Sequence, residues 1–198
     1  TTVSPIIKLG LIPSFVDVEP GKYTVDIEKI KNSINKNTKA LMIPLLLGNV
    51  PDMEKLRKIT KENNLFLIVD SCDTVGASFK SKPVGSYSDI ITASFYASHV
   101  ITAGGNGGML MVDNLKLRNR LMLLRGWGRS SSIFSESESI DKRFRKKIQG
   151  IPYDAKFLFE EIGYNFLPSE MGAAFGNGQL DKLGNFRKIR KRNFNKLY

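Results

Sequence analysis

The stretch IITASFYASHVITAGGNGG, residues 90–108, decides the fold of this chain. It begins as an apolar run rich in β-branched residues and then turns to small polar ones, which is typical of a buried strand. Ligands bind open parallel sheets at the carboxyl ends of the strands, so Ser94 is placed to hold an anion. His99, the only histidine of the chain, follows. The glycine-rich residues 104–108 allow close backbone approach to a ligand, and they are equally compatible with a plain tight turn.

Strand patterns and helix patterns alternate before this stretch. PSFVDV (residues 13–18) reads as a short strand, ALMIPLLL (residues 40–47) as a strand buried on both faces, and LFLIV (residues 65–69) as the next buried strand. Two sets of apolar residues recur at helical spacing: Ile27, Ile30 and Ile34 after Asp26, and Met53, Leu56 and Ile59 after Pro51. The alternation predicts an α/β fold in which helices flank a mostly parallel sheet.

The composition is that of an ordinary globular protein, with 41% hydrophobic and 25% charged residues in 198. No apolar run approaches the roughly 20 residues needed to cross a bilayer, and the amino end lacks the layout of a signal peptide, so we expect a cytoplasmic protein. Cys72 is the only cysteine, which excludes an internal disulfide and a Cys/His metal site of the usual spacing. The chain does not begin with Met, and we expect a fragment.

The formal net charge of +11 raises the question of a nucleic-acid partner. Two basic clusters stand out, residues 142–147 and 187–192. The second falls in a helical pattern with Leu183, Phe186 and Ile189 along one side, so we interpret it as a solvated helix face. No nucleic-acid-binding motif accompanies the charge. We expect no nucleic acid, while a nucleotide diphosphate substrate would use some of these cations.

Two carboxylates, Asp70 and Asp73, follow the strand at residues 65–69. Either one alone reads equally well as a helix cap. Both together, with Ser94 and His99 after the next strand, indicate a ligand site. A buried aspartate at this place pairs well with a protonated ring nitrogen, because the opposite charges keep each other ionised. Pyridoxal phosphate (PLP) enzymes use an aspartate in this way.

Residues 69–110 resemble the cofactor segment of the DegT-type sugar aminotransferases, PLP enzymes of the aspartate aminotransferase fold. That family has an Asp-x-x-Gln/Asp-x-x-Gly stretch, then Ser-Phe-x-x-x-Lys and a glycine-rich turn. The corresponding positions are Asp70, Asp73, Gly76, Ser94, Phe95 and His99. Residues 15–26, 45–53 and 163–183 also resemble family segments. The resemblance implies that the chain is most of a PLP-binding large domain, with a helix from about Ser169 leading toward a small carboxyl-terminal domain outside it.

His99 departs from the family pattern, because it replaces the lysine that forms a Schiff base with PLP, and imidazole cannot make that bond. The subgroup with histidine here is the 3-dehydratases of nucleotide-linked 4-keto-6-deoxysugars, and residues 94–105 and 125–129 resemble them. The resemblance implies a lyase that works with pyridoxamine phosphate (PMP) in deoxysugar and lipopolysaccharide synthesis, with His99 as the base. Histidine suits proton transfer near neutral pH. The alternative is a structural histidine on a turn.

The resemblance also implies roles for the remaining site residues. Asp70 would pair with the pyridinium nitrogen, Asp73 would contact the ring hydroxyl, and Ser94 would bind the cofactor phosphate. Asn165 would reach the phosphate of a neighbouring subunit, which implies a homodimer, or it is a turn residue after Gly163.

Residues 127–141 also correspond to family segments, and the resemblance raises two questions about them: a sugar contact and an iron–sulfur cluster. Trp127 and Arg129 either line the sugar pocket or cap a helix that ends near Arg125. Residues 130–141 contain no cysteine where iron–sulfur members of the subgroup place several, and such clusters need thiolates. We expect no iron–sulfur cluster and no other metal, and glutamate as the amino donor. Two alternatives remain open, a 4-aminotransferase of the same fold and a non-catalytic binding protein.

Overall fold

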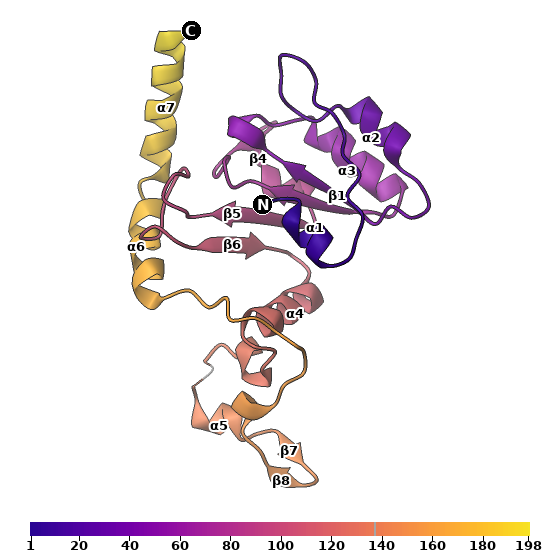
Figure 1. The fold of residues 1–198 in the computed structure, drawn as a ribbon. Coiled ribbons are helices and arrows are strands. Elements are labelled where there is room, and N and C mark those ends of the chain that lie inside the picture. Colours follow the sequence, from indigo (N-terminus) through magenta and orange to yellow (C-terminus); the bar gives the residue numbers. More distant parts are fainter. Residues whose placement is uncertain (137) are drawn as a thin grey trace. The chain divides into compact units, whose positions relative to one another are not determined.

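Figure 1 shows the computed structural model, which describes residues 1–136 and 138–198. The chain forms two compact units. The first unit comprises Thr1–Met111 and Glu170–Tyr198, and the second comprises Val112–Ser169.

The first unit is built on a four-stranded sheet in the order β1-β2-β5-β6. Its strands are β1 (Ala40–Pro44), β2 (Phe66–Asp70), β5 (Ile90–Ser94) and β6 (Gly108–Met111). β1, β2 and β5 are parallel, and β6 runs antiparallel to β5. The register places Asp70 opposite Thr92. The predicted α/β fold with a mostly parallel sheet is confirmed.

Two strand predictions were wrong in part. Residues 13–18 form no strand, and only an isolated bridge between Val18 and Val25 marks this segment. The apolar run at residues 40–47 forms a strand only as far as Pro44, and a 3-10 turn, Leu46–Gly48, follows. β1 is also an edge strand with exposed ends, not one buried on both faces. Pro44 has no backbone N–H, which suits an edge and not the middle of a sheet.

Both predicted helices of this half of the chain are present, as α2 (Ile27–Ser33) and α3 (Met53–Glu62). Asp26 caps α2 by accepting hydrogen bonds from two backbone N–H groups of its first turn, and Asp52 caps α3 by accepting one from the Lys55 amide. The core lies between these helices and the sheet. Its fully buried apolar side chains are Met53, Leu56, Leu67 and Val69, all with no exposed area, and burying each contributes about 1.5–3 kcal/mol.

Asp89 ties α3 to the start of β5. Its carboxylate accepts two hydrogen bonds of 2.8 Å from the Arg57 guanidinium and one of 2.8 Å from the Leu67 amide. Burial alone would raise the pKa of Asp89, but these hydrogen bonds outweigh it and hold the pKa below its usual range. The pair is mostly shielded from water, so it contributes more than a surface ion pair does.

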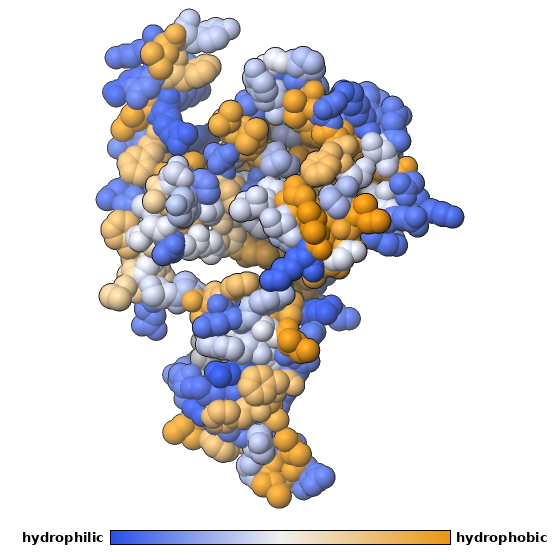
Figure 2. Space-filling view, in the orientation of Figure 1, coloured by the Kyte–Doolittle hydropathy of each residue, from blue (hydrophilic) through white to orange (hydrophobic). Residues whose placement is uncertain are grey.

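The remaining elements of the first unit are short or lie toward the carboxyl end (Figure 1). They are α1 (Ser4–Lys8), the hairpin β3 (Ser78–Phe79) and β4 (Lys82–Pro83), a 3-10 turn Val84–Tyr87, α6 (Glu170–Leu180) and α7 (Leu183–Leu197). α7 has no fully buried residue. Its partly buried positions are the predicted apolar ones, Leu183, Phe186 and Ile189, and its other positions are exposed. The predicted solvated basic face is confirmed. Figure 2 shows apolar side chains on the surface around α1 as well.

The second unit contains α4 (Leu115–Arg125), α5 (Ile140–Arg143), the hairpin β7 (Lys147–Ile148) and β8 (Ile151–Pro152), and 3-10 turns at Ser130–Ile133 and Ala155–Phe157. α4 ends at Arg125 as predicted. Across the part of the chain that the structure describes, no helix is both long and apolar enough to span a membrane.

Candidate functional site

Four of the five predicted site residues lie at one edge of the sheet. Asp70 is the last residue of β2, and Ser94 is the last residue of β5. Asp73 and His99 follow in the turns after these two strands. Because β2 and β5 are parallel neighbours, their carboxyl ends meet, as the sequence order predicted. Asn165 belongs to the second unit.

Asp70 is held by three donors. The Thr2 hydroxyl donates to Oδ2 at 2.7 Å, the Cys72 amide donates to Oδ1 at 3.2 Å, and the Thr92 hydroxyl lies 3.5 Å from Oδ1. Burial would raise the pKa of this half-buried carboxyl, but the hydrogen bonds together hold the pKa below its usual range. Asp70 is therefore a fixed negative charge at neutral pH, as a partner for a protonated ring nitrogen must be.

Cys72 lies beside this carboxylate. Burial raises the pKa of its thiol to about 11, and the hydrogen bond to Asp70 and the charge of Asp70 add to the effect. A thiol with so high a pKa stays protonated at neutral pH, and only the thiolate is an effective nucleophile. Cys72 therefore supports Asp70 and does no nucleophilic chemistry of its own.

His99 faces Asp73. The distance from Nε2 to Asp73 Oδ1 is 3.6 Å, and the His99 side chain is 23% exposed. The Tyr96 ring meets the imidazole edge-on at 6.1 Å between centroids. Nδ1 is buried and makes no hydrogen bond within the described residues. A structural histidine normally has its buried nitrogens paired, so this environment speaks against the purely structural alternative.

Ser94 is positioned by the turn that follows it. Its Oγ accepts a hydrogen bond of 3.2 Å from the Tyr96 amide, which leaves the hydroxyl hydrogen free to donate. The glycine-rich turn closes behind it through a 2.9 Å bond from the Phe95 amide to the Gly107 carbonyl. Gly107 has φ +125°, and a Cβ there would lie 3.3 Å from Ala103, so this position requires glycine. The turn is a packed connection between β5 and β6.

Asn165 sits in an irregular segment of the second unit. It forms an isolated antiparallel bridge with Gly126, and its neighbours Tyr164 and Phe166 stack their rings 4.8 Å apart. Its side chain is exposed. The contact with a cofactor phosphate stays a prediction, and so do the cofactor roles of the other four residues.

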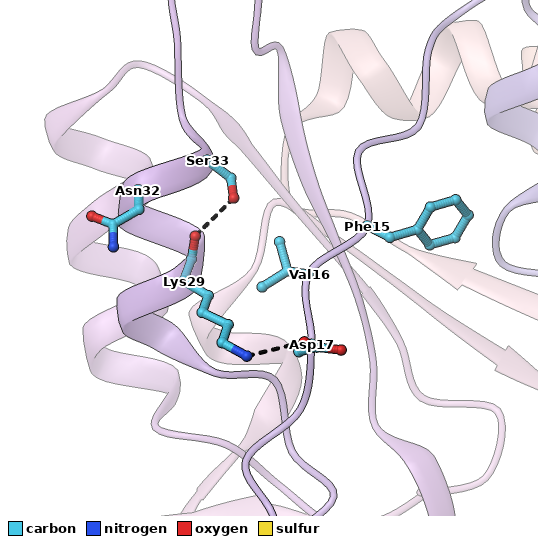
Figure 3. A pocket seen from close by; sticks show the side chains of 6 residues that line it. All are labelled: Phe15, Val16, Asp17, Lys29, Asn32 and Ser33. Atoms are coloured by element: carbon cyan, nitrogen blue, oxygen red, sulfur yellow. Dashed lines mark hydrogen bonds and ion pairs between the residues drawn. The ribbon is translucent and has the colours of Figure 1, made fainter.

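Figure 3 shows a separate, open pocket of about 550 Å³ in the first unit, between residues 15–17 and α2. Its two charged side chains satisfy each other, because Lys29 Nζ lies 3.0 Å from Asp17 Oδ2. Ser33 donates to the Lys29 carbonyl at 2.8 Å. No charge among these lining residues is left over for a ligand, so this pocket is a weaker candidate than the sheet edge. Among the described residues, no group of three His, Cys, Asp or Glu side chains is arranged to hold a metal ion.

Thr2 and Thr92 are the site residues that sequence reasoning missed. Thr92 stands two residues before Ser94 and opposite Asp70 in the register, so strand pairing alone brings it near. Thr2 is 68 positions from Asp70, and no local pattern connects them.

The site residues fit a pyridine cofactor with a phosphate and a ring hydroxyl. Asp70 provides a fixed anion, Ser94 provides a free hydroxyl donor, and His99 and Asp73 provide a proton-transfer group with a carboxylate partner. Four polar side chains that could hold such a cofactor therefore lie at one sheet edge of the first unit, whereas Asn165 belongs to the second unit.

The chain is similar in sequence and in structure to proteins named as nucleotide-sugar dehydratases. The chain is 36% identical over 200 residues to a dTDP-4-dehydro-2,6-dideoxy-D-glucose 3-dehydratase of Saccharopolyspora spinosa, covering 100% of this chain and 43% of that protein. The solved structure of an E. coli GDP-4-keto-6-deoxy-D-mannose-3-dehydratase with bound hydrated PLP matches with a TM-score of 0.84 and 29% identity, over 97% of this chain and 48% of that one. A GDP-4-keto-6-deoxymannose-3-dehydratase solved with a trapped PLP-glutamate geminal diamine matches with a TM-score of 0.79 and 28% identity, over 92% and 46%.

The chain spans about half the length of these relatives. The sequence pattern of the DegT/DnrJ/EryC1/StrS aminotransferase family matches residues 1–198. The mostly parallel sheet with flanking helices agrees with that match. The chain belongs to the DegT/DnrJ/EryC1/StrS aminotransferase family.

Proposed function

We propose that the complete protein containing this chain is a PLP- and PMP-dependent 3-dehydratase of a nucleotide-linked 4-keto-6-deoxyhexose. The feature that carries the proposal is His99, which the sequence resemblance matches to the lysine of the sugar aminotransferases and which lies 3.6 Å from the Asp73 carboxylate at the sheet edge. The similarity to 3-dehydratases acting on dTDP- and GDP-linked sugars supports the same class of substrate.

Asp70, Asp73, Ser94 and Asn165 would bind and orient the cofactor. Asp70 would face the ring nitrogen with its fixed negative charge, Asp73 would contact the ring hydroxyl, and Ser94 would donate to the phosphate. PMP bound in this way supplies an amine for the sugar ketone and a ring that takes up the electrons of a broken C–H bond.

His99 would move the proton. Nε2 is the nitrogen that faces Asp73, whereas Nδ1 is buried without a hydrogen bond among the described residues. It would take a proton from the carbon next to the cofactor ring and return it to the departing 3-hydroxyl. Once protonated, the ring gains an ion pair with Asp73 at 3.6 Å. Because His99 makes no covalent bond to the cofactor, the amine stays free for the sugar.

Glutamate would supply the amine for each turnover. The structure of a relative with a trapped PLP-glutamate adduct supports this donor. Residues 130–141 contain no thiolate for an iron–sulfur cluster, so electrons have no route to the cofactor through this segment and the product would leave with loss of ammonia. The enzyme would act as a cytoplasmic homodimer in the synthesis of deoxysugars for lipopolysaccharide.

The test is His99→Asn in the complete protein. We expect it to bind PMP with the affinity of the parent protein and to lose turnover by about a hundred- to ten-thousandfold. Ser98→Ala, at an exposed neighbouring position, is the matched control and should keep full activity. Turnover that survives in His99→Asn would refute the proposed mechanism.

The amino donor is tested separately by product analysis. The parent protein should release ammonia and 2-oxoglutarate in step with deoxysugar. Strict dependence on NADH and a reductase, without a glutamate requirement, would contradict this part of the proposal and would leave the role of His99 standing.

A further inference from the structure

Thr2 connects the segment before α1 with the sheet edge of the first unit. Its hydroxyl donates to Asp70 Oδ2 at 2.7 Å, which is the shortest hydrogen bond that the described residues make to this carboxylate. Thr2 is partly buried, and a bond of 3.2 Å from the Ser4 amide to the Thr1 carbonyl holds the backbone around it in a turn. α1 buries no residue, so the packing of this helix does not explain why Thr2 lies against Asp70.

The other donors to Asp70 come from its immediate surroundings. The Cys72 amide donates to Oδ1 from two positions along the chain, and the Thr92 hydroxyl lies 3.5 Å from the same oxygen, opposite Asp70 in the register. β1 places Pro44 opposite Asp70 on the other side, and proline has no N–H to donate. Thr2 therefore holds one carboxylate oxygen while the turn and β5 hold the other. The carboxylate cannot rotate about its Cβ–Cγ bond without breaking hydrogen bonds.

Asp70 has no cationic partner among the described residues. No Lys, Arg or His there pairs with its carboxylate, and donors without charge hold it. The titratable groups at this end of the sheet are the Cys72 thiol, which contacts Asp70, and Asp73, which faces His99. Burial raises the pKa of Asp70, and its hydrogen bonds, led by those of Cys72 and Thr2, lower it. Because a thiol is a weak donor, the negative charge of Asp70 depends strongly on the Thr2 hydroxyl.

We propose that Thr2 is a positioning residue of the cofactor site, which fixes the Asp70 carboxylate in the orientation that the ring nitrogen of the cofactor needs. The inference rests on the proposed function, in which Asp70 faces that nitrogen. A ring N–H bonds well to a carboxylate only when it points closely at an oxygen, so a carboxylate held at both oxygens is ready before the cofactor binds. A neutral hydroxyl holds the carboxylate without cancelling its charge, whereas a cationic donor would compete with the ring nitrogen. Supporting hydrogen bonds of this kind keep a binding side chain within the narrow geometry that its ligand requires.

The test compares Thr2→Val with Thr2→Ser in the complete protein. Valine has nearly the shape of threonine but no hydroxyl, whereas serine keeps the hydroxyl and loses the methyl group. Thr1→Val is the matched control, because Thr1 is the exposed neighbour and bonds the Ser4 amide through its backbone carbonyl, which valine keeps. We expect Thr1→Val and Thr2→Ser to behave like the parent protein, and Thr2→Val alone to change.

The first measurement needs no cofactor. NMR of isotope-labelled aspartate carboxyl groups follows the titration of Asp70 in the cofactor-free protein, and Asp70→Asn identifies its signal. Thr2→Val should raise the pKa of Asp70 toward its usual range, because a donor to the charged form is lost. An unchanged pKa in Thr2→Val would overturn the inference, and so would an equal rise in Thr1→Val. A loss of stability in Thr2→Val without the rise in pKa would show a merely structural role and would overturn it as well.

The second measurement is the affinity for PMP, determined by calorimetry across a range of pH. At neutral pH Thr2→Val should bind PMP about tenfold more weakly, as expected for the loss of one charged hydrogen bond, and Thr2→Ser should restore the affinity. Since the pKa of Asp70 rises in Thr2→Val, its PMP affinity should also begin to fall at a higher pH than that of the parent protein. Equal PMP affinity of Thr2→Val and the parent protein at every pH would refute the inference alone. A parent protein that binds no PMP would instead refute the proposed function.

Discussion

The two units hold their structure by different means. The first unit buries apolar side chains between α2, α3 and the sheet, and Leu67 and Val69 have no exposed area. The second unit has few buried apolar residues in its described part, and its buried positions include the hydroxyls of Ser130 and Ser131. Close backbone contacts, hydrogen bonds and ion pairs take the place of an apolar core there. The difference teaches that the sheet edge of the first unit is supported by a buried apolar core, whereas the second unit depends on polar contacts.

Removing core volume is expected to have the largest effect. Leu67→Ala should lower the free energy of unfolding by about 2–5 kcal/mol, because the fully buried site leaves a cavity. Phe66→Ala on the same strand, where the side chain is 57% exposed, should lower it by no more than about 1 kcal/mol. Chemical denaturation of the complete protein measures both. Equal losses would show that the first unit is not held by its apolar core.

The second-largest effect is expected from replacing a closely packed glycine of the second unit, Gly128. In Gly128→Ala the new Cβ would overlap the Glu161 carbonyl, and φ is +80°. Gly150→Ala is the matched control, because its φ is +84° with nothing within 4 Å, so it carries only the conformational cost of about 1 kcal/mol. Hydrogen exchange should speed up at the Trp127, Gly128 and Ser130 amides in Gly128→Ala alone. Unchanged protection would contradict the close packing of this turn.

The Arg57–Asp89 pair should give a smaller, pH-dependent effect. Asp89→Asn should lower stability at neutral pH by about 1–2 kcal/mol, because it weakens charged hydrogen bonds. The folded pKa of Asp89 is lowered, so its contribution is present above its unfolded pKa near 4 and is lost as pH falls through the folded pKa. The difference between parent and variant should therefore shrink below about pH 4. Asp17→Asn removes a carboxylate from an exposed ion pair, and it should cause almost no loss of stability at any of these pH values.

The sequence predicted the elements that rest on apolar periodicity. α2, α3, β2 and β5 have the expected positions, because their apolar residues are buried at the expected spacing. The site at the carboxyl edge of the sheet could be predicted from strand order alone. Asp70 and Ser94 end two parallel neighbouring strands, so they lie at the same edge. Residues 13–18 do not form the expected strand. In the described sheet β1 is the edge strand, and residues 13–18 do not pair with β1.

Contacts between residues far apart in the chain could not be predicted from the sequence. The Thr2 hydroxyl reaches Asp70 across 68 positions, and Gly128 packs against Glu161 across an irregular part of the chain. Neither leaves a periodic signal. The roles of Trp127 and Arg129 stayed open for the same reason, since sequence alone does not show that their guanidinium and indole groups stack.

The central claim is that His99 has taken the place of the cofactor-binding lysine. The direct measurement is borohydride reduction of the complete protein with PLP, followed by peptide mapping. No label should appear within residues 94–108, which contain no lysine, and none at Lys80, whose hydrogen bond to Glu54 raises the pKa of its amine and keeps it protonated. His99→Lys should become labelled at position 99. Stoichiometric label at Lys80 or Lys82 in the parent protein would contradict the claim.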